Sequence, residues 1–193
     1  LLLAIILVWV ASLIMGLGLP VTASYIVLVI LVGPALANEF GVPLLIAHLL
    51  VFWYSQDSNV TPPVALAAFA AAAISGGKTM GTSYEAWKYA KGLYMIPMYF
   101  VFNHALIMGG DIPTLVWDTL LLTLSLVAFA AVFEGFLYTW MRWYTRLAVC
   151  VGMVLVFFPN TTYELLGVAL IVVPSALNYL AAKRTPPHPV PAA

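Results

Sequence analysis

A polar segment that ends in two prolines interrupts an otherwise apolar run, and it constrains the fold more than any other feature. The segment is residues 55–63, and apart from His48 the residues around it, from 42 to 74, are apolar or small. Its prolines lack amide hydrogens, and their rings clash with the preceding turn of a helix. We therefore expect a helix that arrives at this segment to open within residues 57–61.

The composition indicates that this run lies in a lipid bilayer. Of the 193 residues, 64% are hydrophobic and 7% are charged, against about half and about a quarter in soluble domains. Apolar runs of roughly 17 to 25 residues recur, which is the length that a helix needs to cross the hydrocarbon core. The sequence therefore predicts an all-α integral membrane protein. Seven basic and seven acidic residues balance, so no nucleic-acid partner is indicated.

An opened backbone is tolerated at membrane depth only where protein buries it or where it lines a wet cavity. An ionisable residue beside it is a candidate for a functional site, and Asp57 is such a residue. Its carboxylate could bind a cation or take up a proton. It could instead cap the helix that follows, or bond Gln56 and Asn59. These interpretations remain open at the level of sequence.

A glycine-rich turn near the start is the second unusual feature. Residues 1–15 and 21–36 read as two apolar helices joined by residues 16–20, Gly-Leu-Gly-Leu-Pro. The glycines permit a tight turn, and the proline suits the first turn of the next helix. Because the turn carries no charge, a re-entrant hairpin buried in protein is favoured over a short loop between ordinary spans. We expect the Gly33-Pro34 pair to kink or end the second helix.

The rest of the chain divides into three parts. We expect residues 1–110 to form one unit, made of the hairpin (1–36), a broken helix (42–76) and a span (92–108). Residues 111–184 read as a transmembrane extension, and the proline-rich residues 185–193 read as a disordered tail. The chain opens in mid-helix without Met, which we interpret as the C-terminal portion of a longer protein.

The charged residues predict an orientation. When the chain is followed through the expected membrane crossings, every basic residue falls on the same side of the membrane: Lys78, Lys88, Lys91, Arg142, Arg146, Lys183 and Arg184. The other side receives Glu39, Asp111 and Glu164. Since positive charge accumulates on the cytoplasmic side, we expect a multi-pass inner-membrane protein whose hairpin opens outward and whose C-terminus is cytoplasmic.

A glycine-tipped hairpin followed by a broken helix is the arrangement expected at the midplane of secondary transporters. A helix starting near Val64 would direct its partial positive charge at the break and favour an anionic substrate group. The Thr61 hydroxyl and carbonyl groups near Ser58 are oxygen ligands suited to Na⁺. The alternative is a proline kink whose hydroxyl groups bond their own backbone.

Two stretches carry a resemblance to a known family. They are residues 16–25, GLGLPVTASY, and residues 55–67, SQDSNVTPPVALA. They resemble the large membrane subunit of tripartite ATP-independent periplasmic (TRAP) transporters, and more narrowly the fused permeases of the TAXI branch. The resemblance covers roughly residues 1–110, and residues 114–182 are similar to the C-terminal extension of the same permeases.

The resemblance implies an elevator-type permease of inverted repeats, of which this chain holds the second hairpin and the second broken helix. It implies a coupling ion between the hairpin tip and the break, held largely by backbone carbonyls. Carried over to this sequence, the ion-binding positions are Gly16, Gly18, Ser58, Thr61 and Val64. Candidates for substrate binding or proton coupling are Thr22, Asp57 and Asn59.

The partners implied are a small organic anion as substrate, a periplasmic substrate-binding protein, the bilayer, and the rest of the parent permease N-terminal to this segment. We therefore expect a secondary transporter that imports a small organic acid, with Na⁺ or H⁺ as coupling ion and no other cofactor. A channel or a structural membrane subunit is the alternative. An enzyme is not expected, since no nucleophile, metal set or partner carboxylate accompanies Asp57 at a useful spacing.

Overall fold

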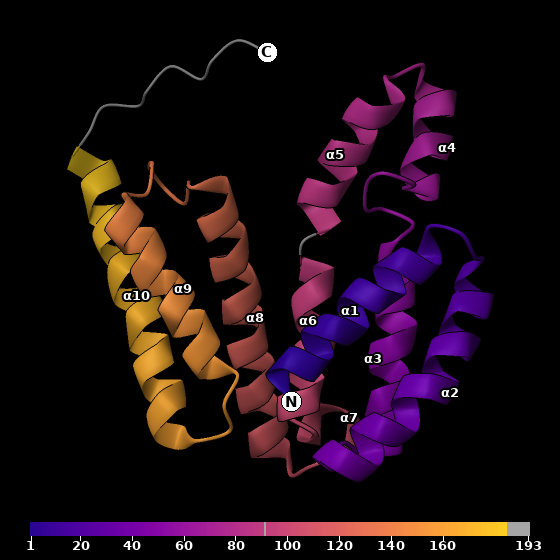
Figure 1. Cartoon of the computed structure of the whole chain (residues 1–193). Helices are drawn as coiled ribbons and strands as arrows, with labels where there is room; N and C mark the ends of the chain where they lie inside the picture. Colours follow the sequence, from indigo (N-terminus) through magenta and orange to yellow (C-terminus); the bar gives the residue numbers. More distant parts are fainter. Residues whose placement is uncertain (91, 185–193) are drawn as a thin grey trace. The chain divides into compact units, whose positions relative to one another are not determined.

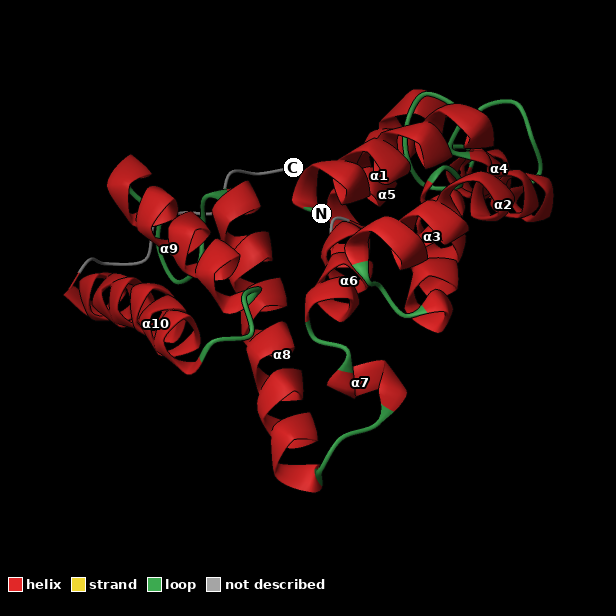
Figure 2. Cartoon of the chain, turned by 60° about the horizontal axis from the view of Figure 1, so that its bottom comes forward, coloured by secondary structure: helices red, strands yellow, loops and turns green. Residues whose placement is uncertain are grey.

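The computed structural model describes residues 1–90 and 92–184, and the expected tail at 185–193 lies outside the described residues. The described chain is a series of helices joined by loops (Figures 1 and 2). In chain order the helices are α1 (Leu2–Gly16), α2 (Val21–Phe40), α3 (Leu44–Asp57), α4 (Leu66–Ser75), α5 (Thr79–Ala90), α6 (Gly92–Phe102), α7 (Ala105–Met108), α8 (Ile112–Glu134), α9 (Trp143–Val156) and α10 (Thr161–Arg184). The all-α fold expected from the sequence is confirmed.

Three of these helices are long and apolar enough to cross a membrane. They are α2, α8 and residues Thr161–Lys183 of α10. The apolar helices α1, α4 and α9 are shorter. Large apolar side chains on α2 stay uncovered by protein, such as Ile30 at 67% and Leu31 at 69% exposed. Such a surface is stable against lipid rather than water.

The chain divides into two compact units, residues Leu1–Gly110 and Asp111–Ala193. In the first unit α3 is the central helix, because α1, α2 and α6 all pack against it. Its buried residues recur at helical spacing, as Ile46, Leu50 and Tyr54 do, each at most 2% exposed. α3 thereby holds the end at Asp57 in a fixed position relative to α1 and α6.

Of the two outcomes expected at Gly33-Pro34, a kink or an end of the helix, the end does not occur there. α2 continues through Pro34 and ends at Phe40, where Gly41 adopts a left-handed conformation with φ 66°. The Val42 amide then bonds the Leu36 carbonyl at 3.1 Å and closes the helix end. A proline removes one hydrogen bond from a helix, and apolar helices in membranes tolerate that loss. A glycine free to take positive φ ends this helix instead.

The expected span at 92–108 is also divided. α6 ends at Phe102, and the four-residue helix α7 begins at Ala105. Between them a ring nitrogen of His104 lies 2.9 Å from the Val101 carbonyl oxygen. A side chain that bonds a carbonyl three residues earlier competes with the regular helix ladder.

In the second unit α9 packs against both α8 and α10. Gly152 and Gly167 let α9 and α10 approach closely. A Cβ atom on Gly152 would lie 2.8 Å from the Gly167 carbonyl oxygen, and one on Gly167 would lie 2.7 Å from the Gly152 carbonyl oxygen. Small residues at such a contact let two membrane helices bring their backbones together.

Candidate functional site

The helix opens where the sequence predicts, but it resumes later. α3 ends at Asp57 and α4 begins at Leu66, so residues 58–65 form the break. Val64 therefore lies inside the break rather than at the start of the second half-helix. The physical reason is Ala65, which takes a left-handed conformation with φ 31° and delays the helix. The Pro62-Pro63 peptide bond is cis.

Local hydrogen bonds fold the start of the break. The Asp57 carbonyl accepts the amides of Val60 at 3.2 Å and Thr61 at 3.0 Å. It also accepts the Thr61 hydroxyl at 2.6 Å. Further along, the Ala67 amide donates to the Asn59 carbonyl at 3.0 Å and ties α4 back to the break. The Asp57 carbonyl is thus fully used within the protein.

The prolines leave other carbonyl groups open. In a helix the carbonyl of one residue accepts from the amide four residues later, and a proline has no such amide. Pro20 stands four residues after Gly16, and Pro62 stands four residues after Ser58. Among the described residues nothing donates to either carbonyl. The Val64 carbonyl is likewise without a donor in that part of the chain.

The turn between α1 and α2 touches the break through one glycine. A methyl group on Gly16 would overlap both the Cβ and the Oγ atoms of Ser58. Both residues are buried. By contrast, a Cβ atom on Gly18 would meet no atom within 4 Å, and Thr22 is exposed. The structure therefore brings Gly16 against the break, whereas Gly18 makes no such contact.

Most hydroxyl groups of the segment return to nearby backbone. Ser58 Oγ donates to the Ser55 carbonyl at 3.1 Å, and Ser55 Oγ donates to the Val51 carbonyl at 2.8 Å. The side-chain amide of Asn59 donates through Nδ2 to Gln56 Oε1 at 3.3 Å. This is the pattern of a kink whose side chains satisfy their own backbone. An incoming ligand at the break therefore has carbonyl groups available rather than free hydroxyl groups.

Asp57 is the exception among these polar side chains. Its side chain is 0% exposed, and neither carboxylate oxygen has a hydrogen-bond partner among the described residues. It neither caps α4 nor bonds Gln56 or Asn59. A buried carboxylate without a partner is costly, so this position suits a bound cation or a proton.

A tyrosine that the sequence did not single out completes the site. The hydroxyl oxygen of Tyr94, on α6, lies 2.7 Å from the hydroxyl oxygen of Thr61. The Thr61 proton is already donated to the Asp57 carbonyl, so Tyr94 must be the donor to Thr61. The Tyr54 hydroxyl donates to the Tyr94 carbonyl at 3.2 Å. Trp9 of α1 packs edge-on against the Tyr94 ring, with 5.4 Å between the ring centroids.

Tyr54 and Tyr94 also lie near enough to the Asp57 carboxylate for an electrostatic interaction with it. Helices α1, α3 and α6 thus converge on the start of the break. The only sequence signal for Tyr94 was a tyrosine within an apolar span, whose hydroxyl group must find a partner when buried. No motif marked it.

The histidines are engaged away from this site. His48 Nδ1 lies 2.8 Å from the Tyr25 hydroxyl oxygen, and His104 bonds the Val101 carbonyl. Within the residues that the structure describes, no three His, Cys, Asp or Glu side chains gather in a group that could hold a metal ion. The oxygen atoms that the break offers a cation are its open backbone carbonyl groups and the Asp57 carboxylate.

Comparison with known proteins gives a family. A family model described as tripartite ATP-independent periplasmic transporter, DctM component, matches residues 1–115. Searches of curated proteins and of solved structures gave no match. The matched residues cover more than half of the chain and include the glycine turn, the break and Tyr94. The chain therefore belongs to the DctM component family of tripartite ATP-independent periplasmic transporters.

Proposed function

We propose that this chain imports a small organic acid and that a gradient of Na⁺ or protons drives the import. Its family is one of secondary transporter permeases that act in a membrane together with a substrate-binding protein. The substrate class, the direction and the ion coupling are our proposal. So are membership of the TAXI branch and the interpretation of the chain as the C-terminal portion of a longer permease.

The contact between Gly16 and Ser58 is the observation that supports this proposal best. Each of these residues has a carbonyl group that a proline four positions later leaves without a donor. Discontinuous helices in transporters use carbonyl groups of this kind to coordinate Na⁺. We propose that a cation binds between the two residues, with the open Val64 carbonyl as a further ligand. Thr61, whose hydroxyl group already bonds the Asp57 carbonyl and Tyr94, would contribute the remaining lone pair of its oxygen. Gly18 stays a candidate on the resemblance alone.

The buried Asp57 carboxylate favours the binding of a cation or a proton. A carboxylate buried without a partner costs free energy, and neutralising its charge removes much of that cost. A neutral site also crosses a membrane more easily than a charged one. We propose that joint binding of cation and substrate neutralises the hairpin and the break, which then move across the bilayer as a unit.

The substrate is proposed to bind at the same break. α4 begins at Leu66, and the first amides of a helix favour an anionic group. The half-buried Asn59 lies within the break, and its side-chain amide can hydrogen-bond a carboxylate. Thr22 is exposed on the neighbouring helix and remains a candidate for substrate contact. These features favour a small organic acid.

Uptake of radiolabelled C4 and C5 organic acids tests the proposal. The permease would be reconstituted in liposomes with its binding protein, and an inward Na⁺ gradient would be compared with an inward proton gradient. Uptake driven by Na⁺ and weakened by Thr61→Ala would support a cation at the break. Uptake driven by protons and abolished by Asp57→Asn would make Asp57 the proton carrier. The absence of uptake under both gradients would refute the proposal and favour a channel or a structural subunit.

A further inference from the structure

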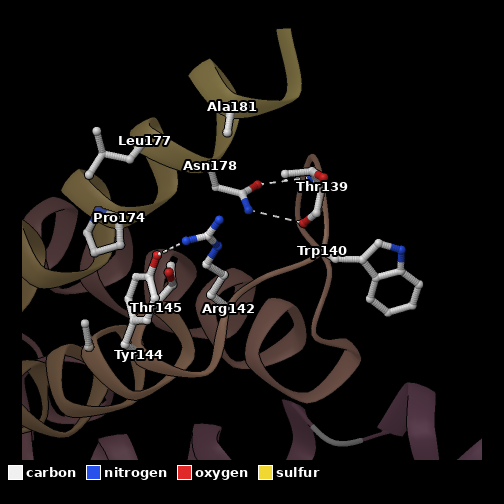
Figure 3. Close-up of a pocket in the computed structure, with 10 residues that line it drawn as sticks. Thr139, Trp140, Arg142, Tyr144, Thr145, Pro174, Leu177, Asn178 and Ala181 are labelled. Carbon is white, nitrogen blue, oxygen red and sulfur yellow. Dashed lines mark hydrogen bonds between the residues drawn. The ribbon is translucent and has the colours of Figure 1, made fainter. Parts of the chain in front are cut away.

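The second unit contains a cavity of about 450 Å³ where the start of α9 meets the last turns of α10 (Figure 3). One wall carries Arg142, Tyr144 and Thr145, and the other carries Pro174, Leu177 and Asn178. None of the described residues that line it is acidic. The cavity thus combines one cationic side chain and several hydrogen-bonding groups with an apolar wall.

Arg142 directs its guanidinium group into this cavity, between the Tyr144 hydroxyl and Asn178 (Figure 3). One N–H group donates to Tyr144 Oη at 3.1 Å. A guanidinium has five N–H donors, and the others find no acceptor in the described part of the chain. Arg142 therefore keeps both its charge and most of its donors for a ligand.

The neighbouring arginine, which lies in the first turn of α9, uses its donors differently. Arg146 donates through Nε and Nη2 to the Val132 carbonyl, at 3.0 and 2.6 Å. Its Nη2 also reaches the Phe133 carbonyl at 3.3 Å. These are the open carbonyl groups at the end of α8, which a basic side chain commonly satisfies. Arg146 is thus structural, whereas Arg142 is not used in this way.

The cavity wall is fastened in place before any ligand binds. Asn178 is 7% exposed, and its Oδ1 accepts the amides of Tyr138 at 3.1 Å and Thr139 at 3.2 Å. Its Nδ2 donates to the Thr139 carbonyl at 3.2 Å. Three hydrogen bonds therefore attach the loop before Arg142 to α10. A site that is already formed loses little free energy to ordering when it binds.

The surroundings suit a lipid rather than a free ion. Trp140 and Trp143 are 68% and 76% exposed beside the cavity, and exposed indole rings are typical of the boundary between hydrocarbon and headgroups. Pro174 and Leu177 continue the cavity wall along α10 toward the middle of the expected span. A ligand with a phosphate at one end and hydrocarbon at the other would contact both kinds of wall.

We propose that this cavity binds the phosphate headgroup of an anionic membrane phospholipid. Arg142 donates to the phosphate oxygens, assisted by the hydroxyl groups of Tyr144 and Thr145, while the acyl chains run along Pro174 and Leu177. Guanidinium groups match the geometry of phosphate oxygens through paired hydrogen bonds. Basic pockets between membrane helices bind anionic headgroups in this way.

Native mass spectrometry of the whole protein in detergent tests the proposal. Phosphatidylglycerol, phosphatidylcholine or inorganic phosphate would be added, and bound molecules would be counted. The wild type should bind phosphatidylglycerol in preference to phosphatidylcholine. Arg142→Gln should weaken that binding about tenfold, the loss expected for one charge-assisted contact. Lys183→Gln is the matched control, since it removes a charge near the same end of α10 from a residue that does not line the cavity.

A second variant tests the cavity without removing Arg142, in case the loss of Arg142 disturbs folding. Ala148 lines the cavity and is half-buried, so Ala148→Phe fills it while Arg142 stays. This variant should lose phosphatidylglycerol binding as well, with the thermal unfolding midpoint confirming its fold. Three results would overturn the proposal: equal binding in wild type and Arg142→Gln, no preference between the two lipids, or displacement of the lipid by inorganic phosphate.

Discussion

Gly16 is the residue on which the contact between the turn and the break depends. Because a Cβ atom there would overlap Ser58, Gly16→Ala should overpack a buried contact and lower the free energy of unfolding by about 1 to 3 kcal/mol. Gly18→Ala is the matched control, since its Cβ atom would meet nothing and should change stability by less than about 0.5 kcal/mol. Thermal or denaturant unfolding in detergent measures both.

A double variant separates this overlap from other effects of a methyl group. Ser58→Gly removes the atoms that the new Cβ of Gly16→Ala would meet. The stability lost in Gly16→Ala should therefore recover when both changes are combined. Equal stability of Gly16→Ala and Gly18→Ala, or the absence of any recovery, would contradict the contact.

Asp57 allows a test of cation binding that needs no transport. A ligand that binds only the folded state raises its stability, by about 2.7 kcal/mol at one hundred times its dissociation constant. If the cation binds beside the Asp57 carboxylate, NaCl should raise the unfolding midpoint more than choline chloride does, and Asp57→Asn should remove the difference. The control is Asp118→Asn, which alters another buried carboxyl, in the second unit. A sodium effect that persists in Asp57→Asn would place the ion elsewhere.

At the scale of elements, the break is held by α6 as well as by its own turns. Tyr94→Phe removes the hydroxyl group that donates to Thr61 at 2.7 Å, and one hydrogen bond contributes about 1 kcal/mol. Hydrogen exchange at the Thr61 amide should therefore become about fivefold faster. Tyr84→Phe is the control, because Tyr84 is 52% exposed and should leave this exchange unchanged. Equal exchange in both variants would show that α6 does not hold the break.

The start of α8 gives a prediction about pH. The Thr114 hydroxyl donates to Asp111 Oδ1 at 2.7 Å and lowers the pKa of that exposed carboxyl from its usual value. A lowered pKa means that the carboxylate stabilises the fold above about pH 3.9, its unfolded pKa, and that this contribution is lost as pH falls through the folded pKa. Thr114→Ala should raise the pKa of Asp111, as followed by NMR titration, whereas Thr114→Ser should not. An unchanged pKa in Thr114→Ala would assign the shift to another cause.

The sequence predicted the elements that depend on local chemistry. The opening of α3 at Asp57 follows from prolines five and six residues later, and the turn after Gly16 follows from its glycines and Pro20. The end of α2 at Phe40 rather than near residue 36 was missed, since a lone proline in an apolar helix costs one hydrogen bond and packing decides where the helix ends. Tyr94 was missed for a related reason. Its partner Thr61 lies on another element, and only the packing of α6 against α3 brings the two together.

At the scale of the whole molecule, the distribution of charge predicts the orientation in the membrane. Single cysteines would be introduced after the native thiol, which is exposed, is removed by Cys150→Ala. In cells, Glu39→Cys and Glu164→Cys should react with an impermeant maleimide from outside, whereas Lys88→Cys and Lys183→Cys should react only after permeabilisation. If both positions of a pair react from the same side, the chain crosses the membrane an even number of times between them. One position on the wrong side would contradict the expected spans.

The two open carbonyl groups at Gly16 and Ser58 have a consequence for how such a site tolerates sequence change. A main-chain oxygen persists whatever side chain its residue carries, so many substitutions near the break would leave the oxygen in place. Pro20 and Pro62 are different, because replacing either one returns an N–H group that competes for the same oxygen. If a cation binds these oxygens as proposed, a saturation scan of transport should therefore be most intolerant at Pro20 and Pro62, whose side chains would not contact the cation. A search for charged ligands would overlook both residues.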